Sequence, residues 1–342
     1  LRRDQKSLEA AMKYFLLGAF SSGFFVYGTA MIYGYAGSMH YAQIAEAVAG
    51  RTSGQALLLI GMGMLAIALL FKVGAAPFQT WVPDVYQGAP TAVTAFMAAA
   101  TKAAAFGALL RLFYVAFGGA RWHWLPIMFA IAILTMVVGS VLALAQNDIK
   151  RLLAYSSIAH AGFILVGFLG ARSAIAAGDI NPIQAVLFYL VTYGFATLGA
   201  FAVVGLVRDA SGEATTLASW AGLAKKSPLV AGAFALFLLG MAGIPLTSGF
   251  VGKWAVFASA LAAGAWPVVV AAILASIIAA FFYIRVIVLM FFSDPLPDGP
   301  AVAIPSILTA ITIALGVAVT VVLGVIPGPL LDLAARAGEF IR

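Results

Sequence analysis

The sequence predicts an all-α membrane protein, a polytopic bundle of transmembrane helices, and three observations support this fold class. Hydrophobic residues make up 64% of the 342 residues and charged residues only 9%, whereas a soluble domain has about 25% charged residues. The apolar runs repeatedly reach about 20 residues, the length that crosses a bilayer as a helix. Two of these runs are longer and contain glycine and proline. A β-barrel would instead show short segments of alternating polarity.

The apolar runs predict about nine membrane spans joined by short connections. The longest connection, 208–227, holds five charged residues and is expected to be a solvated loop. Because no stretch has the composition of a flexible linker, we expect a single membrane domain over 1–342. The expected spans are 12–35, 55–87, 91–117, 124–145, 151–170, 182–207, 228–263, 267–292 and 301–325.

The second and seventh of these spans are too long for one straight helix. The seventh would reach about 50 Å, whereas the hydrocarbon core is about 30 Å thick. Gly74 and Pro77 interrupt the second span, and Gly243 and Pro245 interrupt the seventh. Proline removes a backbone donor and clashes with the preceding turn, so both spans are predicted to be discontinuous helices. Unwound backbone at membrane depth must be buried in protein or line a wet cavity.

Three lysines lie inside these spans without an acidic neighbour: Lys72, Lys102 and Lys253. Each costs about 2.5–3.5 kcal/mol at the bilayer centre, and buried ionisable groups usually mark a charge or proton path. Since desolvation disfavours the ammonium form, we predict that these side chains gain and lose protons. The alternative for Lys72 and Lys102 is a side chain that reaches the membrane surface. The alternative for Lys253 is a structural cation that binds carbonyls at the helix break.

His160 is a further candidate, because histidine titrates near neutral pH and suits a proton relay. Tyr155, Ser156 and Ser157 precede it by about one helical turn and could share water with it. The alternative is a buried neutral histidine with both ring nitrogens hydrogen-bonded. Glu9 and Lys13 have the spacing of a surface ion pair. Asp84 is expected to pair with a cation at the membrane face.

The basic residues suggest an orientation and exclude some function classes. The positive-inside rule places residue 1 in the cytoplasm and residue 342 outside. No basic cluster is dense enough for nucleic acid. The absence of cysteine excludes thiolate sites, and no nucleotide-binding or metal-binding motif occurs, so we expect no cofactor or metal in this chain. The sidedness rests on nine basic residues in the loops on one side and five on the other: Arg2, Arg3, Lys6, Lys13, Lys150, Arg151, Arg208, Lys225 and Lys226 against Arg51, Arg121, Arg172, Arg336 and Arg342.

Four stretches together resemble a known family. They are LEAAMKYFLLGAFSSGFFVYG, FKVGAAPFQTWVPDVYQGAPTAVTAFMAAATKAAAF, NDIKRLLAYSSIAHAGF and GMAGIPLTSGFVGKWAVF. These sequences resemble the antiporter-like membrane subunits of proton-pumping NADH:quinone oxidoreductase, respiratory complex I. Mrp-type cation/proton antiporters belong to the same family. The first stretch, and a lysine after GIPLTSGFVG, resemble the subunit N branch. The resemblance covers nearly the whole chain.

The resemblance implies about fourteen helices with two inverted five-helix repeats, each with a half-channel around a discontinuous helix. It divides this chain into 1–117 (the later part of the first repeat with a preceding or connecting helix), 118–292 (the second repeat) and 293–342 (a terminal helix). The first helices would then precede Leu1, and with them the glutamate that partners the first lysine. The chain begins with Leu and is therefore expected to be the later part of a longer one.

The resemblance also implies roles for single residues. Lys72 matches the lysine of the first broken helix, Lys102 the central connecting lysine, and Lys253 the lysine of the second broken helix. His160 resembles the histidine of a polar axis through the membrane. Gln79 stands where many relatives have histidine, which weakens a relay role at that position.

The expected function is therefore that of a non-redox membrane-arm subunit of NADH:quinone oxidoreductase. It would move protons through half-channels linked by buried lysines, driven by quinone reduction elsewhere in the complex. Expected partners are other membrane subunits of complex I, antiporter-like and small, with protons and the lipid of a bacterial inner membrane. One alternative is an Mrp-type cation/proton antiporter subunit. Another is a structural membrane scaffold, in which the lysines only stabilise carbonyls at helix breaks.

Overall fold

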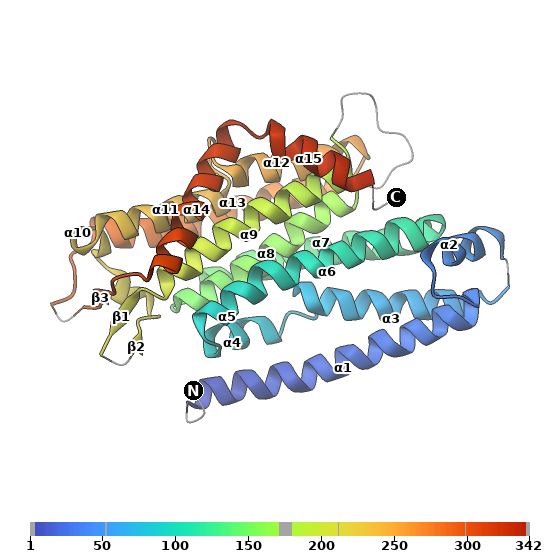
Figure 1. Ribbon diagram of the computed structural model, residues 1–342, viewed down its shortest axis with the longest axis horizontal. Coiled ribbons are helices and arrows are strands. Elements are labelled where there is room, and N and C mark those ends of the chain that lie inside the picture. The colour runs from blue at the N-terminus through green and yellow to red at the C-terminus, as the bar shows by residue number, and fades with distance from the viewer. Residues whose placement is uncertain (1–3, 52, 171–179, 211, 298, 340–342) are drawn as a thin grey trace.

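The computed structural model describes residues 4–339 except 52, 171–179, 211 and 298. Its helices lie side by side along one long axis, and short strands gather at one end of the bundle (Figure 1). Eight of the described helical segments are long and apolar enough to cross a membrane. The predicted class, an all-α polytopic transmembrane bundle, is confirmed. The α-helices are α1 (Gln5–Ala36), α2 (Tyr41–Gly50), α3 (Gln55–Val73), α4 (Trp81–Gly88), α5 (Thr91–Phe96), α6 (Lys102–Leu110), α7 (Arg121–Leu144), α8 (Ile149–Phe168), α9 (Pro182–Val204), α10 (Leu223–Lys226), α11 (Pro228–Ala242), α12 (Ser248–Ala262), α13 (Trp266–Phe292), α14 (Ile307–Val325) and α15 (Gly328–Glu339).

The two predicted helix breaks are present and have the same backbone geometry. The first separates α3 from α4, and the second separates α11 from α12. Gly74 and Gly243 end the preceding half-helices with φ of 76° and 85°, a left-handed conformation that favours glycine. In each case the next residue donates its N–H to a carbonyl five positions back: Ala75 to Leu70 at 2.9 Å, and Ile244 to Leu239 at 3.1 Å. This is the bonding of a Schellman cap.

Helix α8 is the central element of the bundle, and α14 is the most peripheral. In the most apolar 18-residue window of each helix, 89% of α8 is buried but only 11% of α14. Close packing of α8 depends on small residues, as is usual between membrane helices. A Cβ added at Gly139 of α7 would lie 2.4 Å from the backbone nitrogen of Ala159 in α8. Polar groups on α8 are therefore shielded by protein on most sides.

The connection 208–227 differs from the solvated loop that the sequence predicted. Strands β1 (Val207–Asp209) and β2 (Gly212–Glu213) pair there, and β1 also pairs with β3 (Ala301–Val302). Trp220 of this connection is fully buried. Its indole nitrogen donates to the carbonyl of Ala214 at 2.9 Å. The charged residues had suggested solvent, but most of the segment packs as a cap on one end of the bundle.

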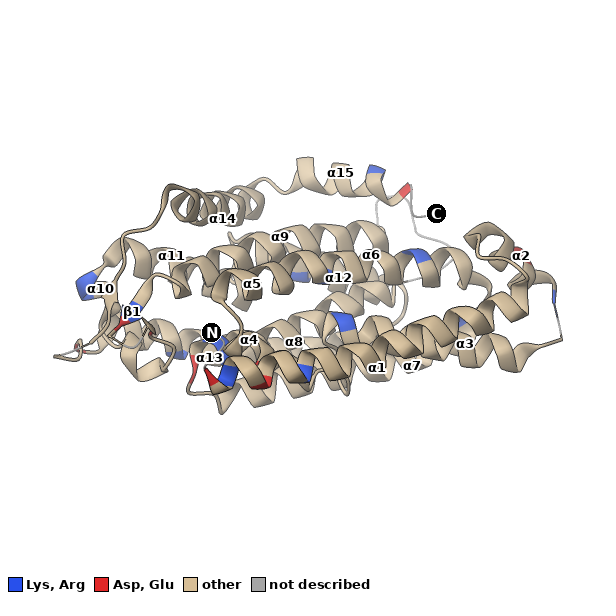
Figure 2. Cartoon of the chain, turned by 60° about the horizontal axis from the view of Figure 1, so that its bottom comes forward, with Lys and Arg blue, Asp and Glu red and all other residues tan. Residues whose placement is uncertain are grey.

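Acidic residues lie toward the two ends of the bundle, whereas its middle carries basic residues (Figure 2). At the end that carries the start of α1, Lys13 bridges Glu9 and Asp84 at 2.5 Å each. Asp84 also pairs with Arg151 at 2.6 Å. The predicted Glu9–Lys13 pair and the predicted cation partner of Asp84 are confirmed. Residues 1 and 342 lie outside the described residues, so the orientation of the chain across the membrane stays a prediction. The division of the chain into repeats at 117/118 and 292/293 also stays a prediction.

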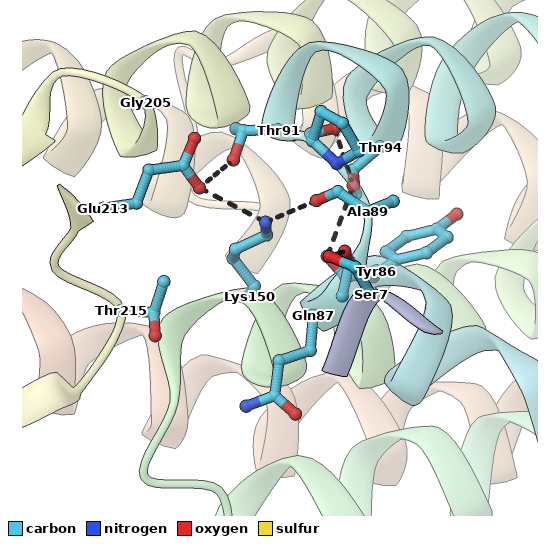
Figure 3. Close-up of polar contacts among 12 residues, drawn as sticks. Ser7, Tyr86, Gln87, Ala89, Thr91, Thr94, Lys150, Gly205, Glu213 and Thr215 are labelled. Carbon is cyan, nitrogen blue, oxygen red and sulfur yellow. Dashed lines mark hydrogen bonds and ion pairs between the residues drawn. The ribbon is translucent and has the colours of Figure 1, made fainter. Parts of the chain in front are cut away.

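A second ion pair at this end is largely buried. Lys150 is 2% exposed, and its ammonium group donates to the carbonyl of Ala89 at 2.8 Å and to Glu213 at 3.3 Å. The same carboxylate oxygen accepts from the hydroxyl of Thr91 at 2.5 Å (Figure 3). The sequence had suggested only a basic anchor at Lys150. The pair instead joins α8 to β2 and to the start of α5.

We expect Glu213→Gln to lower the free energy of unfolding by about 1–3 kcal/mol, because Lys150 then stays buried without its counter-charge. The measurement is the thermal unfolding midpoint of the detergent-purified protein. The double variant with Lys150→Met removes the stranded charge as well and should recover part of this loss. Equal midpoints for the single and the double variant would show that the two side chains are not coupled.

Candidate functional site

Lys102 lies at the start of α6 and is only 3% exposed. Its ammonium group donates to both the carbonyl oxygen and the hydroxyl of Ser157 in α8, at 2.5 and 2.6 Å. Segments of π-helix flank α6 on both sides, η1 (Met97–Thr101) and η2 (Arg111–Ala116). Such segments insert an extra residue into a helical turn and occur frequently at functional sites. The lysine is thus directed into the bundle, toward α8.

His160, three residues further along α8, is 3% exposed and has hydrogen-bond partners at both ring nitrogens. Nδ1 lies 2.8 Å from the hydroxyl of Tyr189, and Nε2 lies 3.1 Å from the hydroxyl of Tyr283. Tyr283 in turn contacts the hydroxyl of Ser156. This geometry matches the alternative to a proton relay, a buried histidine whose two ring nitrogens are both hydrogen-bonded. It also joins four polar side chains, from α8, α9 and α13, into one connected group.

Tyr193 of α9 lies between Lys102 and His160. The ammonium group of Lys102 lies 5.3 Å from the centre of its ring, and the His160 ring lies 4.9 Å from it. The hydroxyls of Tyr193 and Thr197 are buried, and neither has a hydrogen-bond partner among the residues that the structure describes. A small cavity of about 10 Å³ lies beside these residues, lined by His160, Tyr193 and Gly249 among others. This volume is close to the minimum for one water molecule.

Lys253 in α12 is 5% exposed and lies against the second helix break. Its ammonium group donates to the carbonyl of Ala242 at 2.7 Å and to the hydroxyl of Ser276 in α13 at 2.8 Å. A Cβ at Gly243 would lie 2.9 Å from the lysine Cδ, so glycine is needed at this approach. The Ala242 carbonyl belongs to the last turn of α11, whose carbonyls lack helical donors. Lys253 also lines an open cavity of about 310 Å³.

Lys72 differs from the expectation of a buried side chain. It is exposed on the surface of the described chain, and its nearest aromatic rings are Tyr14 at 5.7 Å and Phe71 at 5.9 Å. Lys72 lies in the last turn of α3, where the described helices leave its side chain uncovered. Among residues 4–339 that the structure describes, no hydrogen bond or ion pair reaches its ammonium group. The structure therefore does not bring Lys72 together with Lys102 and Lys253.

The prolines of the two breaks are also exposed, although the glycines before them are at least partly buried. Pro77 and Pro245 both lie on the surface of the described chain. The unwound backbone was predicted to be enclosed. At the second break this holds for the Ala242 carbonyl, which Lys253 binds, but the prolines of both breaks are not enclosed by the described chain. Gln79 is partly buried, and its side-chain oxygen has no partner in the described part of the chain. The relay roles of all these residues stay predictions.

Sequence reasoning missed several members of this group. Tyr189, Tyr193, Tyr283 and Ser276 were not singled out, because isolated hydroxyl residues in apolar spans give no periodic signal. Ser156 and Ser157 were predicted to accompany His160, but the structure divides them. Ser157 binds Lys102, and Ser156 contacts Tyr283. The Ser-Ser pair faces two neighbours at once because successive residues on a helix point about 100° apart.

Comparison with known proteins places this geometry in a family. The family described as NADH:quinone oxidoreductase/Mrp antiporter, transmembrane, matches residues 1–279. The chain belongs to this family. It is 65% identical to NADH-quinone oxidoreductase subunit N of a Nocardioides species, with 100% of this chain and 65% of that protein covered. It is 60% identical to subunit N of Rhodococcus opacus, with 100% and 62% covered. The chain therefore spans somewhat under two thirds of the length of these relatives.

Solved structures of the NADH:quinone oxidoreductase/Mrp antiporter family share the fold. A chain of respiratory complex I from Thermus thermophilus is 39% identical, with a TM-score of 0.80, 96% of this chain and 70% of that chain covered. A chain of the Mrp complex from Dietzia sp. DQ12-45-1b is 25% identical, with a TM-score of 0.84 and 98% and 68% covered. The predicted resemblance to the antiporter-like family, and to its subunit N branch, is confirmed.

Proposed function

We propose that the chain is a membrane-arm subunit of NADH:quinone oxidoreductase that moves protons across a bacterial inner membrane. It has no redox group of its own in this proposal. Quinone reduction elsewhere in the complex supplies the energy, and other membrane subunits are its partners. The observation that carries the proposal is the buried polar group that runs from Lys102 past Tyr193 to His160 and toward Lys253. The 65% and 60% identities to subunit N proteins support the assignment to complex I.

The chemistry of this group fits proton transfer. Lys102 and Lys253 each donate to one carbonyl and one serine hydroxyl. A neutral amine could keep those contacts as donor, so loss of a proton need not break them. His160 joins two tyrosine hydroxyls and can pass a proton between its two ring nitrogens. Water beside Tyr193 and Thr197 would satisfy their buried hydroxyls and connect the lysine and histidine segments.

The same residues argue against transport of a metal cation through this part of the protein. Hard metal cations such as Ca²⁺ and Mg²⁺ prefer several oxygen ligands, commonly including carboxylates. The basic side chains that are buried in the described residues are Lys102, Lys150, His160 and Lys253, and no aspartate or glutamate is buried there. An Mrp-type cation/proton antiporter remains the second candidate, because the Mrp chain has a TM-score of 0.84 to this one. The lysine-lined interior favours protons.

A structural scaffold accounts for only one of the two candidate relay lysines that are buried, Lys102 and Lys253. Lys253 binds a carbonyl at a helix break, as that hypothesis requires. Lys102 binds Ser157 in the middle of the uninterrupted helix α8, where no carbonyl needs a cation. Lys72 needs cover that the described chain does not provide, because an exposed ammonium group at membrane depth costs about 2.5–3.5 kcal/mol. We infer that protein outside the described residues covers it.

The experiment is purification of the protein from its native membrane, followed by reconstitution into sealed vesicles. We expect co-purification with NADH-oxidising subunits and acidification of the vesicle lumen when NADH and a quinone are added. Co-purification with antiporter subunits alone, with a pH gradient that depends on added Na⁺, would replace this proposal with the Mrp-type function. Assembly with NADH-oxidising subunits but no change in pumping after substitution of Lys102 or of Lys253 would favour the scaffold.

A further inference from the structure

A cavity of about 400 Å³ lies between α5, α9 and α14, at the end of the bundle that carries β1 and β2. Its floor is formed by Leu198, Phe201 and Ala202 of α9, and its walls include Ala95 of α5 and Leu308 of α14. No lysine or histidine of the candidate relay lines it. The cavity is therefore separate from the proposed proton path.

Charged side chains gather at one side of this cavity, and the hydroxyl side chains of Thr309 and Thr312 of α14 also line it. Arg208 of β1 is exposed there, and Glu213 and Thr91 line the same rim. The carboxylate of Glu213 is already bound by Lys150 and Thr91 (Figure 3). Lys150, which does not line the cavity, neutralises Glu213, so Arg208 is the basic side chain that the cavity lining offers to an anion. The cavity is thus mostly apolar inside, with an arginine at its mouth.

The position of the cavity matches the boundary between lipid tails and head groups. Helix α5 begins at Thr91, α9 ends at Val204 and α14 begins at Ile307, all close to the charged rim. Leu198 lies six residues before the end of α9, which corresponds to about 9 Å along the helix. The cavity therefore extends from the membrane surface about a third of the way into a hydrocarbon core about 30 Å thick. Its outer wall, α14, is the least buried span.

We propose that this cavity binds one phospholipid, with its phosphate on Arg208 and an acyl chain along α9. The arginine fork suits a phosphate group, and the apolar walls suit a hydrocarbon chain. The volume is in the range of small-molecule sites, about 300–1,000 Å³. Two turns of a partner helix about 10 Å wide would occupy roughly 850 Å³, more than twice the space. The size therefore favours a lipid chain over a helix of another subunit.

The test is the amount of phospholipid that stays with the purified complex after detergent washing, measured by native mass spectrometry. We expect Ala202→Trp, which fills the floor, to remove one phospholipid per complex. Ala310→Trp places the same side chain on the exposed side of α14, outside the cavity, and should keep that lipid. Arg208→Gln should weaken retention roughly tenfold, because it removes a charge-assisted hydrogen bond, whereas Arg208→Lys should weaken it less.

A phospholipid with a photoreactive acyl chain gives an independent measurement and should cross-link to peptides of α9 or α14 in the wild type. An unchanged lipid count and unchanged cross-linking in Ala202→Trp would overturn the proposal. So would displacement of the lipid by inorganic phosphate, because the acyl chain should hold it without the head group. Loss of a neighbouring subunit from the Ala202→Trp complex, with its lipid retained, would assign the cavity to a protein contact instead.

Discussion

Replacing Lys102 by methionine should reduce proton pumping by the assembled complex by at least about tenfold, because a positioned proton carrier contributes about 10²–10⁴-fold to its transfer step. Methionine is apolar and has a similar length, so it should fill much of the space that the lysine side chain occupies. It removes the two donations to Ser157, whose carbonyl and hydroxyl lie within a helix and tolerate the loss. The effect should therefore fall on pumping more than on folding. The measurement is lumen acidification per NADH oxidised in sealed vesicles.

Two further variants separate the relay from a structural role. Lys102→Arg keeps a positive charge but arginine does not give up its proton in proteins, so it should also fail to pump if Lys102 must change protonation. A structural cation would instead be at least partly restored by arginine. Lys225→Met removes a lysine from an exposed ion pair with Asp294 and should pump normally. Normal pumping by an assembled Lys102→Met complex would refute the relay.

The spans and their breaks could be predicted from the sequence because the bilayer imposes strict conditions. Only helices with satisfied backbones cross it, so about 20 apolar residues predict a span, and Gly74 or Gly243 followed by proline predicts a break. No such condition governs the membrane surface. The sheet that joins β1 to β3 connects Arg208 with Ala301, far apart in the sequence. The surface helices α2 and α15 are also absent from the prediction, because they are too short to span.

The candidate site could be predicted only where charge marked it. A lysine in an apolar run is conspicuous because it is costly, and this signal found Lys102 and Lys253. It could not show which groups receive their protons. His160 meets Tyr189 and Tyr283, which are 29 and 123 residues away. Nor could it show that Lys72 lies on an uncovered side of α3, since that depends on which helices pack against it.

The second large effect is expected at Gly249, where the two half-helices of the second break meet. A Cβ at this position would lie 1.9 Å from the carbonyl oxygen of Gly240 and 2.7 Å from its carbonyl carbon. Both contacts are to backbone, so no side chain can rotate away. Gly249→Ala must therefore push α12 away from α11. Overpacking commonly lowers the free energy of unfolding by about 1–3 kcal/mol, and occasionally by more. We expect a clash with backbone to cost an amount at the upper end of this range.

The displaced helix carries Lys253, whose ammonium group reaches back across the break to Ala242 at 2.7 Å. Gly249→Ala should therefore lower the amount of assembled complex in the membrane, and the fraction that assembles should pump poorly because Lys253 and the cavity beside His160 are disturbed. Gly232→Ala is the matched control, since it lies on α11 with open space around its Cβ. Alanine favours a helix interior over glycine by about 0.5–1 kcal/mol, so this variant should assemble at least as well as the wild type. If Gly249→Ala assembled and pumped as Gly232→Ala does, the close contact of the half-helices would not be what positions Lys253.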